Sequence, residues 1–380
     1  MRHKYVLTLL MCISLTFMPG CWDQNLLKDI SLILTSAVDQ GEDDNVKFSI
    51  TYRKVQQSQS VQQGNTGSYL TTVLTTEAPT LRRARSNFSR NVDQKIDMSK
   101  MRIMLIGDEF AKNQLLPYFD MFYRDPKSPL LANLAVVQGG SCVELINELL
   151  KEKLIVSDYL NNLITTASRS SQVAPKTIQS IRSKMLQTGE DFTLPLIHFD
   201  QSKKLISVKG VALFDNEQKK GELYGQDAIL LTVMDGKMGR YANFTKKVNS
   251  GRKLKENNYI TIQVTDLKRD IHFVNSDHRD LTISLEYEFT TSVLEYPGDD
   301  LDTDKKIEIL NKKLSAILTN EAKEIVAVLQ DSNSDVLSLG RKYRVKHYDE
   351  YMKMNWMTDY PKVKIIPKIK VNITQTGIIS

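Results

Sequence analysis

Several short stretches of the chain alternate between apolar and polar residues, as strands with one buried face do. In the N-terminal half these stretches are 31–38, 47–54, 102–106 and 132–138. Between and after them, apolar residues recur at helical spacing in 108–123, 143–154 and 175–186. The pattern predicts strands and helices that share the same domains.

The second half continues this mixture with longer elements. Alternation predicts strands at 204–214, 258–273, 281–294 and 362–371, and a short apolar run at 228–233 indicates one more strand. Pro367 interrupts the last strand and cannot donate to a sheet, which favours an edge position. Residues 304–329 carry the strongest helical stripe, and such a helix would be about 39 Å long.

Turn-rich breaks divide these elements into units. We predict an N-terminal α/β domain at 21–192, a small middle β-rich domain at 193–236, and a C-terminal α/β domain at 237–380 with its long helix at 304–329. The fold class is therefore α/β (α+β), with mixed β-sheets and flanking helices. A length of 380 residues accommodates two or three domains.

The first twenty residues have the pattern of an export signal. Arg2 and Lys4 precede an apolar run over 6–18, which is shorter than the roughly 20 residues of a membrane-spanning helix. A basic start, an apolar middle and a small residue before a cleavage site are typical of signal peptides. We therefore predict a lipoprotein signal peptide at 1–20.

Cys21 makes the prediction more specific. Residues 18–21 (Met-Pro-Gly-Cys) resemble a lipobox, although Met18 and Pro19 depart from the usual Leu and Ala or Ser. The cysteine is required because a thiolate is the nucleophile that takes the diacylglyceryl group. We expect S-diacylglycerol and N-acyl lipidation at Cys21, and several acyl chains anchor a protein stably to a membrane.

Composition excludes several classes of protein. The net charge of +6 is spread over 51 basic and 45 acidic residues, unlike the concentrated basic surface of a nucleic-acid binder. Three cysteines cannot form a disulfide framework or a Cys-rich zinc site. After cleavage and lipidation Cys142 would be the only free thiol, and we interpret it as a buried structural residue.

Catalytic motifs are missing from the sequence. It contains no P-loop, G-x-G-x-x-G, H-E-x-x-H or C-x-x-C motif. One cluster around a predicted hairpin could offer metal ligands: Asp270, His272, Asp277, His278 and Asp280. Arg279 lies inside the cluster and Asp and Asn are common in turns, so we favour turn chemistry. We predict no metal, no cofactor and no enzymatic activity.

Four segments in order resemble one known family. They are 20–23 (Gly-Cys-Trp-Asp), 101–112 with its continuation to 125, 210–215 with 221–223, and 334–340 followed by Trp356. Together they resemble the Ger(x)C family, the lipoprotein C subunits of GerA-type nutrient germinant receptors of spore-forming bacteria. Asn25, Leu26 and Ser338 depart from the family's usual residues.

The resemblance implies three α/β domains and a non-enzymatic role. It implies a protein anchored through Cys21 to the outer face of the spore inner membrane. It also implies assembly with an integral-membrane A subunit and a transporter-like B subunit, which together start germination in response to nutrients. The nutrient, direct binding of it by this subunit, and the stoichiometry stay open.

Two other functions compete with this interpretation. The first is a substrate-binding lipoprotein of a membrane transporter, which predicts two similar lobes around a deep cleft. The unequal units and the lack of an internal repeat argue against it. The second is a lipid-anchored hydrolase that would use the cluster at 270–280.

Overall fold

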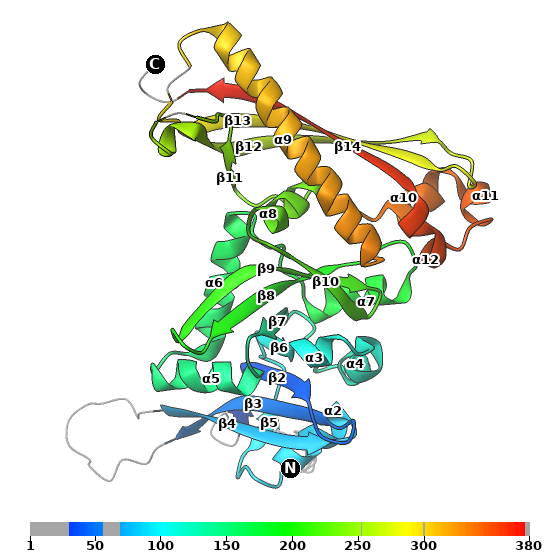
Figure 1. The fold of residues 1–380 in the computed structure, drawn as a ribbon. Coiled ribbons are helices and arrows are strands. Elements are labelled where there is room, and N and C mark those ends of the chain that lie inside the picture. Colours follow the sequence, from blue (N-terminus) through cyan, green and yellow to red (C-terminus); the bar gives the residue numbers. More distant parts are fainter. Residues whose placement is uncertain (1–29, 56–68, 252, 299–300, 377–380) are drawn as a thin grey trace, which may run out of the picture.

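The computed structural model describes residues 30–55, 69–251, 253–298 and 301–376. The predicted signal peptide at 1–20 and the predicted lipidation site Cys21 lie outside the described residues. Two main sheets account for most of the strands; in Figure 1 the smaller lies at the top and the larger extends from the middle to the bottom. Within the described residues, no helix has the length and apolarity needed to cross a bilayer.

The larger sheet has eight strands in the order β10-β9-β8-β7-β6-β2-β3-β4. Its four central strands are parallel, and an antiparallel pair flanks them on each side. The strands are β2 (Thr35–Gln40), β3 (Val46–Val55), β4 (Tyr69–Ala78), β6 (Ile103–Gly107), β7 (Asn133–Gln138), β8 (Thr193–Asp200), β9 (Leu205–Asp215) and β10 (Gln218–Tyr224). A separate parallel pair joins β1 (Ile30–Leu32) to β5 (Lys95–Asp97).

Helices cover both faces of this sheet because its central strands are apolar on both sides. In β6, Ile103 and Leu105 pack into one core, whereas Met104 and Ile106 pack into another. The first core is covered by α5 (Cys142–Lys151), α6 (Val156–Arg169) and α8 (Gly225–Met234). The second is covered by α2 (Leu81–Phe88), α4 (Leu115–Arg124) and α7 (Ile178–Leu186).

The smaller sheet has four strands in the order β11-β12-β13-β14. They are β11 (Ala242–Lys247), β12 (Tyr259–Asn275), β13 (Thr282–Glu295) and β14 (Lys364–Gln375), and only β13 and β14 run parallel. As predicted, Pro367 lies on an edge strand, because β14 pairs with β13 alone. The long helix α9 (Asp304–Asp331) crosses the sheet (Figure 1).

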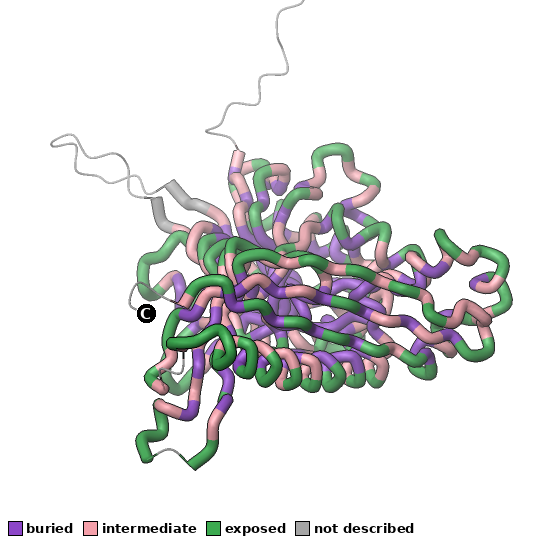
Figure 2. Tube along the Cα trace, turned by 90° about the horizontal axis from the view of Figure 1, so that it is seen from above, coloured by how far each residue is buried: buried purple, intermediate pink, exposed green. Residues whose placement is uncertain are grey.

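The apolar stripe of α9 is buried as predicted. Its buried residues are Leu310, Leu314, Leu318, Ala322, Ile325, Val326 and Leu329. They belong to the same core as α8 and the first face of the larger sheet. Figure 2 shows buried positions gathered towards the interior of the molecule and exposed positions mostly at its rim. One continuous core therefore joins the two sheets.

The strand predicted at 228–233 is wrong. These residues form part of the helix α8, which is buried on nearly all sides between β9, β10, α9 and β11. A short apolar run without polar alternation has the same appearance in a buried strand and a buried helix. The tertiary contacts of residues 228–233 therefore determine that they form a helix.

The helix predicted at 108–123 is interrupted. It consists of α3 (Asp108–Ala111) and α4, separated by Lys112–Gln114. Pro117 lacks the N–H that a continuous helix would need, but it fits the first turn of a new one. The predicted apolar positions Phe110, Leu115, Phe119 and Phe122 are all buried.

Strands of the expected middle domain, 193–236, are hydrogen-bonded into the larger sheet through the pairing of β7 with β8. They therefore continue the sheet of the N-terminal region. The division into three domains remains a prediction. The fold class, mixed sheets with flanking helices, is confirmed.

Candidate functional site

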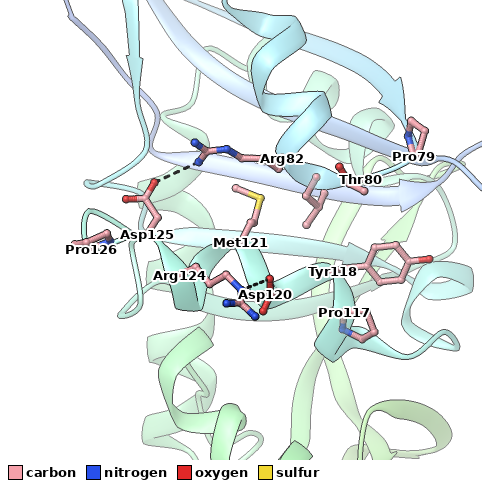
Figure 3. A pocket seen from close by; sticks show the side chains of 11 residues that line it. Pro79, Thr80, Arg82, Pro117, Tyr118, Asp120, Met121, Arg124, Asp125 and Pro126 are labelled. Atoms are coloured by element: carbon pink, nitrogen blue, oxygen red, sulfur yellow. Dashed lines mark hydrogen bonds and ion pairs between the residues drawn. The ribbon is translucent and has the colours of Figure 1, made fainter.

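A groove of about 790 Å³ runs between the helices α2 and α4 (Figure 3). The lining residues come from the N-terminal end of α2, from along the length of α4 and from the segment that follows α4. They are Pro79, Thr80, Leu81, Arg82, Pro117, Tyr118, Asp120, Met121, Arg124, Asp125 and Pro126. The α4 side of the groove lies within the segment 101–125 that the sequence comparison singled out.

A residue distant in sequence positions α4. The backbone N–H of Leu116 donates to the Glu217 carboxylate at 3.1 Å, and that of Leu115 donates to the Glu217 carbonyl at 3.4 Å. Glu217 lies in the turn between β9 and β10. It therefore satisfies free donors at the helix start, where a negative charge is also favourable.

The floor of the groove is apolar. Leu81 and Met121 line it, and both are almost fully buried. Tyr118 and Pro117 form one end (Figure 3), and the Tyr118 ring packs at 4.7 Å between centroids on Phe110. Such a surface can accept an aliphatic or aromatic side chain.

The opposite end is charged. Arg82 and Arg85 contact Asp125 at 3.6 Å and 3.0 Å, and Arg124 contacts Asp120 at 2.7 Å. Hydrogen bonds from the Lys127 backbone and from Arg85 hold the pKa of Asp125 below its usual range. Both lining carboxylates, Asp120 and Asp125, are therefore held in ion pairs with arginines.

The segment 334–340 forms a joint between the two sheets. The backbone N–H of Asp335 donates to Asp191 Oδ2 at 2.6 Å, and Asp191 Oδ1 accepts from Asn216 N–H at 2.7 Å. Asp335 itself accepts from the backbone of Leu339 at 2.8 Å and Gly340 at 2.7 Å. Burial raises the pKa of Asp191 to about 7 and that of Asp335 to about 6.

Two glycines bring the backbones of the joint together. Arg341 N–H donates to the Gly189 carbonyl at 2.8 Å. A Cβ on Gly340 would lie 2.7 Å from the Gly189 Cα and 2.5 Å from Trp356. Gly340 is therefore required because the two backbones approach each other closely. Gly189 has in addition a φ of +86°, which glycine adopts without strain.

Two models of spore germination protein domains together match most of the chain. The sequence model described as "Spore germination protein N-terminal domain" matches residues 23–199, and "Spore germination B3/ GerAC like, C-terminal" matches residues 209–377. The chain belongs to the Ger(x)C family of spore germination proteins. The resemblance seen in the sequence is confirmed.

Two curated relatives of this Ger(x)C chain come from Bacillus subtilis (strain 168). The "Putative spore germination protein YfkR" is 26% identical over 57% of this chain and 56% of the relative, so this match spans about half of that protein. The "Spore germination protein KC" is 20% identical over 100% of this chain and 97% of the relative. Both are named for spore germination.

A solved structure supports the fold. The "Crystal Structure of the GerBC protein" covers 90% of this Ger(x)C chain and 97% of its own, with a TM-score of 0.56 and 15% sequence identity. At this identity the likeness shows the fold alone.

Of the candidate metal ligands that the sequence of this Ger(x)C protein places around the β12–β13 hairpin, only some lie close together. Asp277 and His278 lie with Glu350, with ligand atoms within 4.8 Å of one another. Asp270 and His272 lie further along β12, away from this group. Arg279 binds both oxygens of Asp277 at 3.1 and 2.8 Å.

Glu350, the other carboxylate of this group, is also occupied. It contacts His278 at 2.8 Å and Lys353 at 2.5 Å. These cationic or hydrogen-bonding partners fill the oxygens that a metal would need. The cluster instead connects the β12–β13 turn to α11 (Tyr348–Tyr351).

Cys142 is fully buried at the first position of α5. Burial raises the pKa of its thiol well above the usual value, so the reactive thiolate is disfavoured.

Sequence reasoning missed Glu217 and Asp191, whose partners lie 101 and 144 residues away. A one-dimensional pattern carries no signal for such contacts.

Proposed function

We propose that this chain is the lipid-anchored, non-enzymatic C subunit of a spore nutrient germinant receptor. The observation that carries the proposal is the pair of family matches, which together extend from residue 23 to residue 377. They begin two residues after Cys21, where the sequence predicts a mature N-terminus.

The anchor follows from the sequence of the N-terminus. Diacylglycerol and an N-acyl chain on Cys21 would hold the protein at the outer face of the spore inner membrane. There it would assemble with the membrane A and B subunits of the receptor. The two family domains would then lie outside the bilayer.

We assign the groove between α2 and α4 to contact with a segment of a partner subunit. Its apolar end at Pro117 and Tyr118 would take an aliphatic or aromatic side chain. Its charged end has Arg82 in an exposed position, and this guanidinium would pair with an acidic group of the partner. The proposal therefore commits the groove to protein–protein recognition.

The geometry disfavours a substrate-binding lipoprotein. Such a protein would have two similar lobes, but the two main sheets here have eight and four strands and different strand orders. The described residues therefore support the receptor subunit over this alternative.

Spore membranes provide the experiment. Tagged wild type, Cys21→Ala and Cys12→Ala would be expressed in the source organism, and acylation would be followed by N-terminal mass spectrometry. Proteins that co-purify from membranes would then be identified. Cys12→Ala is the matched control because it changes a thiol inside the segment that cleavage removes.

We expect wild type and Cys12→Ala to carry the lipid and recover A- and B-type membrane proteins. Cys21→Ala should lose the lipid and most of this recovery. Normal membrane retention of Cys21→Ala would overturn the anchor. Recovery of transporter subunits in place of germination proteins would overturn the receptor assignment.

A further inference from the structure

A second cavity, of about 450 Å³, lies between the two sheets beside the joint. Four separate parts of the chain form it: α7 with the loops on either side of it, the turn after α8, β12, and α10 (Leu339–Lys346). Its lining residues are Lys176, Lys184, Glu190, Asp235, Lys237, Arg269, Ser338, Arg341, Lys342, Val345 and Lys346. The cavity therefore exists only when both sheets are in place.

The cavity has a large excess of positive charge. Seven of its eleven lining residues are Lys or Arg, and only Glu190 and Asp235 are acidic. Glu190 is already bound by Lys184 at 2.6 Å and by Arg341 at 3.0 Å. Asp235 is thus the one lining carboxylate left to face the remaining five cations.

Several of these cations share one carboxylate, because Asp235 attracts Lys176, Arg269 and Lys237 together. Arg269 donates from Nη1 to the Asp235 carbonyl at 2.7 Å, but its buried Nε and Nη2 have no acceptor among the described residues. A buried donor without an acceptor is unfavourable, and native proteins satisfy most such groups.

The turn after α8 holds Arg269 in place. Gly236 has a φ of +71°, and a Cβ there would lie 2.8 Å from Arg269 Nη1. The guanidinium therefore packs directly against this glycine and has little room to swing towards solvent.

The charges also destabilise one another. Burial and the nearby Arg269 lower the pKa of Lys342 to about 8, against the opposing effect of nearby carboxylates. Burial lowers the pKa of Lys176 as well, and Lys184 and Lys237 add to this while Asp235 opposes it. A bound negative charge would oppose the mutual repulsion of these cations.

We propose that this cavity binds a small anion with two or more negative charges, of the phosphate or polycarboxylate type. A planar guanidinium offers paired donors that match the oxygens of such groups, and lysines add compact point charges. The volume admits a molecule of several heavy atoms and excludes a folded protein element. The inference goes beyond the receptor assignment and does not depend on it.

Titration calorimetry on the purified full-length chain tests the proposal, with inorganic phosphate and citrate as probes and the ionic strength held constant. The variants are Lys176→Gln and Arg269→Gln. Lys323→Gln is the matched control, because Lys323 is exposed on α9 and carries the same charge. Thermal unfolding without anion checks that each variant is folded.

We expect saturable binding by wild type and by Lys323→Gln. Lys176→Gln should weaken it at least about tenfold, because a hydrogen bond to a charged group is lost. If Arg269→Gln does not fold, anion binding by Lys176→Gln and Lys237→Gln is compared with wild type instead. Absence of saturable binding to phosphate and citrate together with absence of binding to anionic vesicles, or equal weakening in Lys323→Gln, would overturn the proposal.

The anion has two possible sources, a free solute or a lipid headgroup. Co-sedimentation with phosphatidic acid vesicles, whose phosphomonoester headgroup can carry two negative charges, compared with phosphatidylcholine vesicles, distinguishes them. Binding of phosphate or citrate in solution supports a free solute. Lys176-dependent binding to phosphatidic acid vesicles alone supports a headgroup, whereas binding to neither counts against the site.

Discussion

Trp356 donates its indole N–H to the carboxylate of Asp335 at 3.1 Å. Both residues are buried, and the carboxylate belongs to the joint between the two sheets. Three tyrosine rings surround the indole with centroid distances of 5.7–6.2 Å: Tyr343, Tyr351 and Tyr360. The pair therefore connects the C-terminal helices to the joint.

Replacing Trp356 by Phe should test this connection. Phenylalanine retains much of the ring packing but removes the donor, and the carboxylate then loses one of its three hydrogen bonds. We expect the free energy of unfolding to fall by about 1–3 kcal/mol, measured by urea denaturation. Tyr348→Phe is the control, because Tyr348 is exposed. Equal losses in both variants would contradict the prediction.

Gly340→Ala should be more damaging than an ordinary glycine substitution. The new Cβ would lie 2.7 Å from the Gly189 Cα, and neither backbone can move without opening the joint. We expect a loss of about 3 kcal/mol or more in denaturation experiments. Gly225→Ala is the comparison, since its φ is +51° but nothing lies within 4 Å. Backbone strain alone costs about 1 kcal/mol there.

Regular elements with one exposed face were predictable from the sequence. β12 and β13 alternate because one side of their sheet is solvated, and α9 shows its stripe because only one face is buried. α8 was not predictable, because a helix buried on nearly all sides has no polar face to reveal its period.

The sites were less predictable than the elements. The sequence singled out 334–340 and 101–125, but nothing in it paired Asp335 with Asp191 or α4 with Glu217. Those contacts depend on how the sheets and their connecting turns come together. The cationic cavity likewise combines four distant segments, and only one of them, α10, is strongly basic by itself.

The joint should make stability depend on pH. Asp191 has a pKa of 3.8 when unfolded and about 7 when folded, so the folded state binds its proton more tightly. Unfolding therefore releases a proton between these values, and stability falls as the pH rises from about 4 to 7. Asp335, with a pKa of about 6, acts in the same direction.

Urea denaturation at pH 4.5, 5.5, 6.5 and 7.5 measures this dependence. Asp191 alone would account for at most roughly 4 kcal/mol across the range. Asp191→Asn should flatten the curve, and Asp331→Asn, which changes an exposed acid, should not. Stability that rises over this range would contradict the raised pKa values.

The groove offers a test of partner recognition by charge reversal. Arg82 and Arg83 are adjacent and exposed on α2, but only Arg82 lines the groove. Arg82→Glu would place a negative charge beside Asp125, whose pKa is already held low, and would repel an acidic partner group. We expect recovery of A and B subunits from spore membranes to fall at least about fivefold.

Arg83→Glu makes the same change in charge one residue away and should leave recovery near the wild-type level. Unfolding curves should be similar for the two variants, because the ion pair of Arg82 at 3.6 Å is exposed and contributes at most about 1 kcal/mol. A selective loss with Arg82→Glu would therefore reflect recognition and not folding. Equal recovery with both variants would show that the groove is not part of the receptor interface. The proposed anchor at Cys21 would not be affected by that result, because the Cys21→Ala experiment tests it separately.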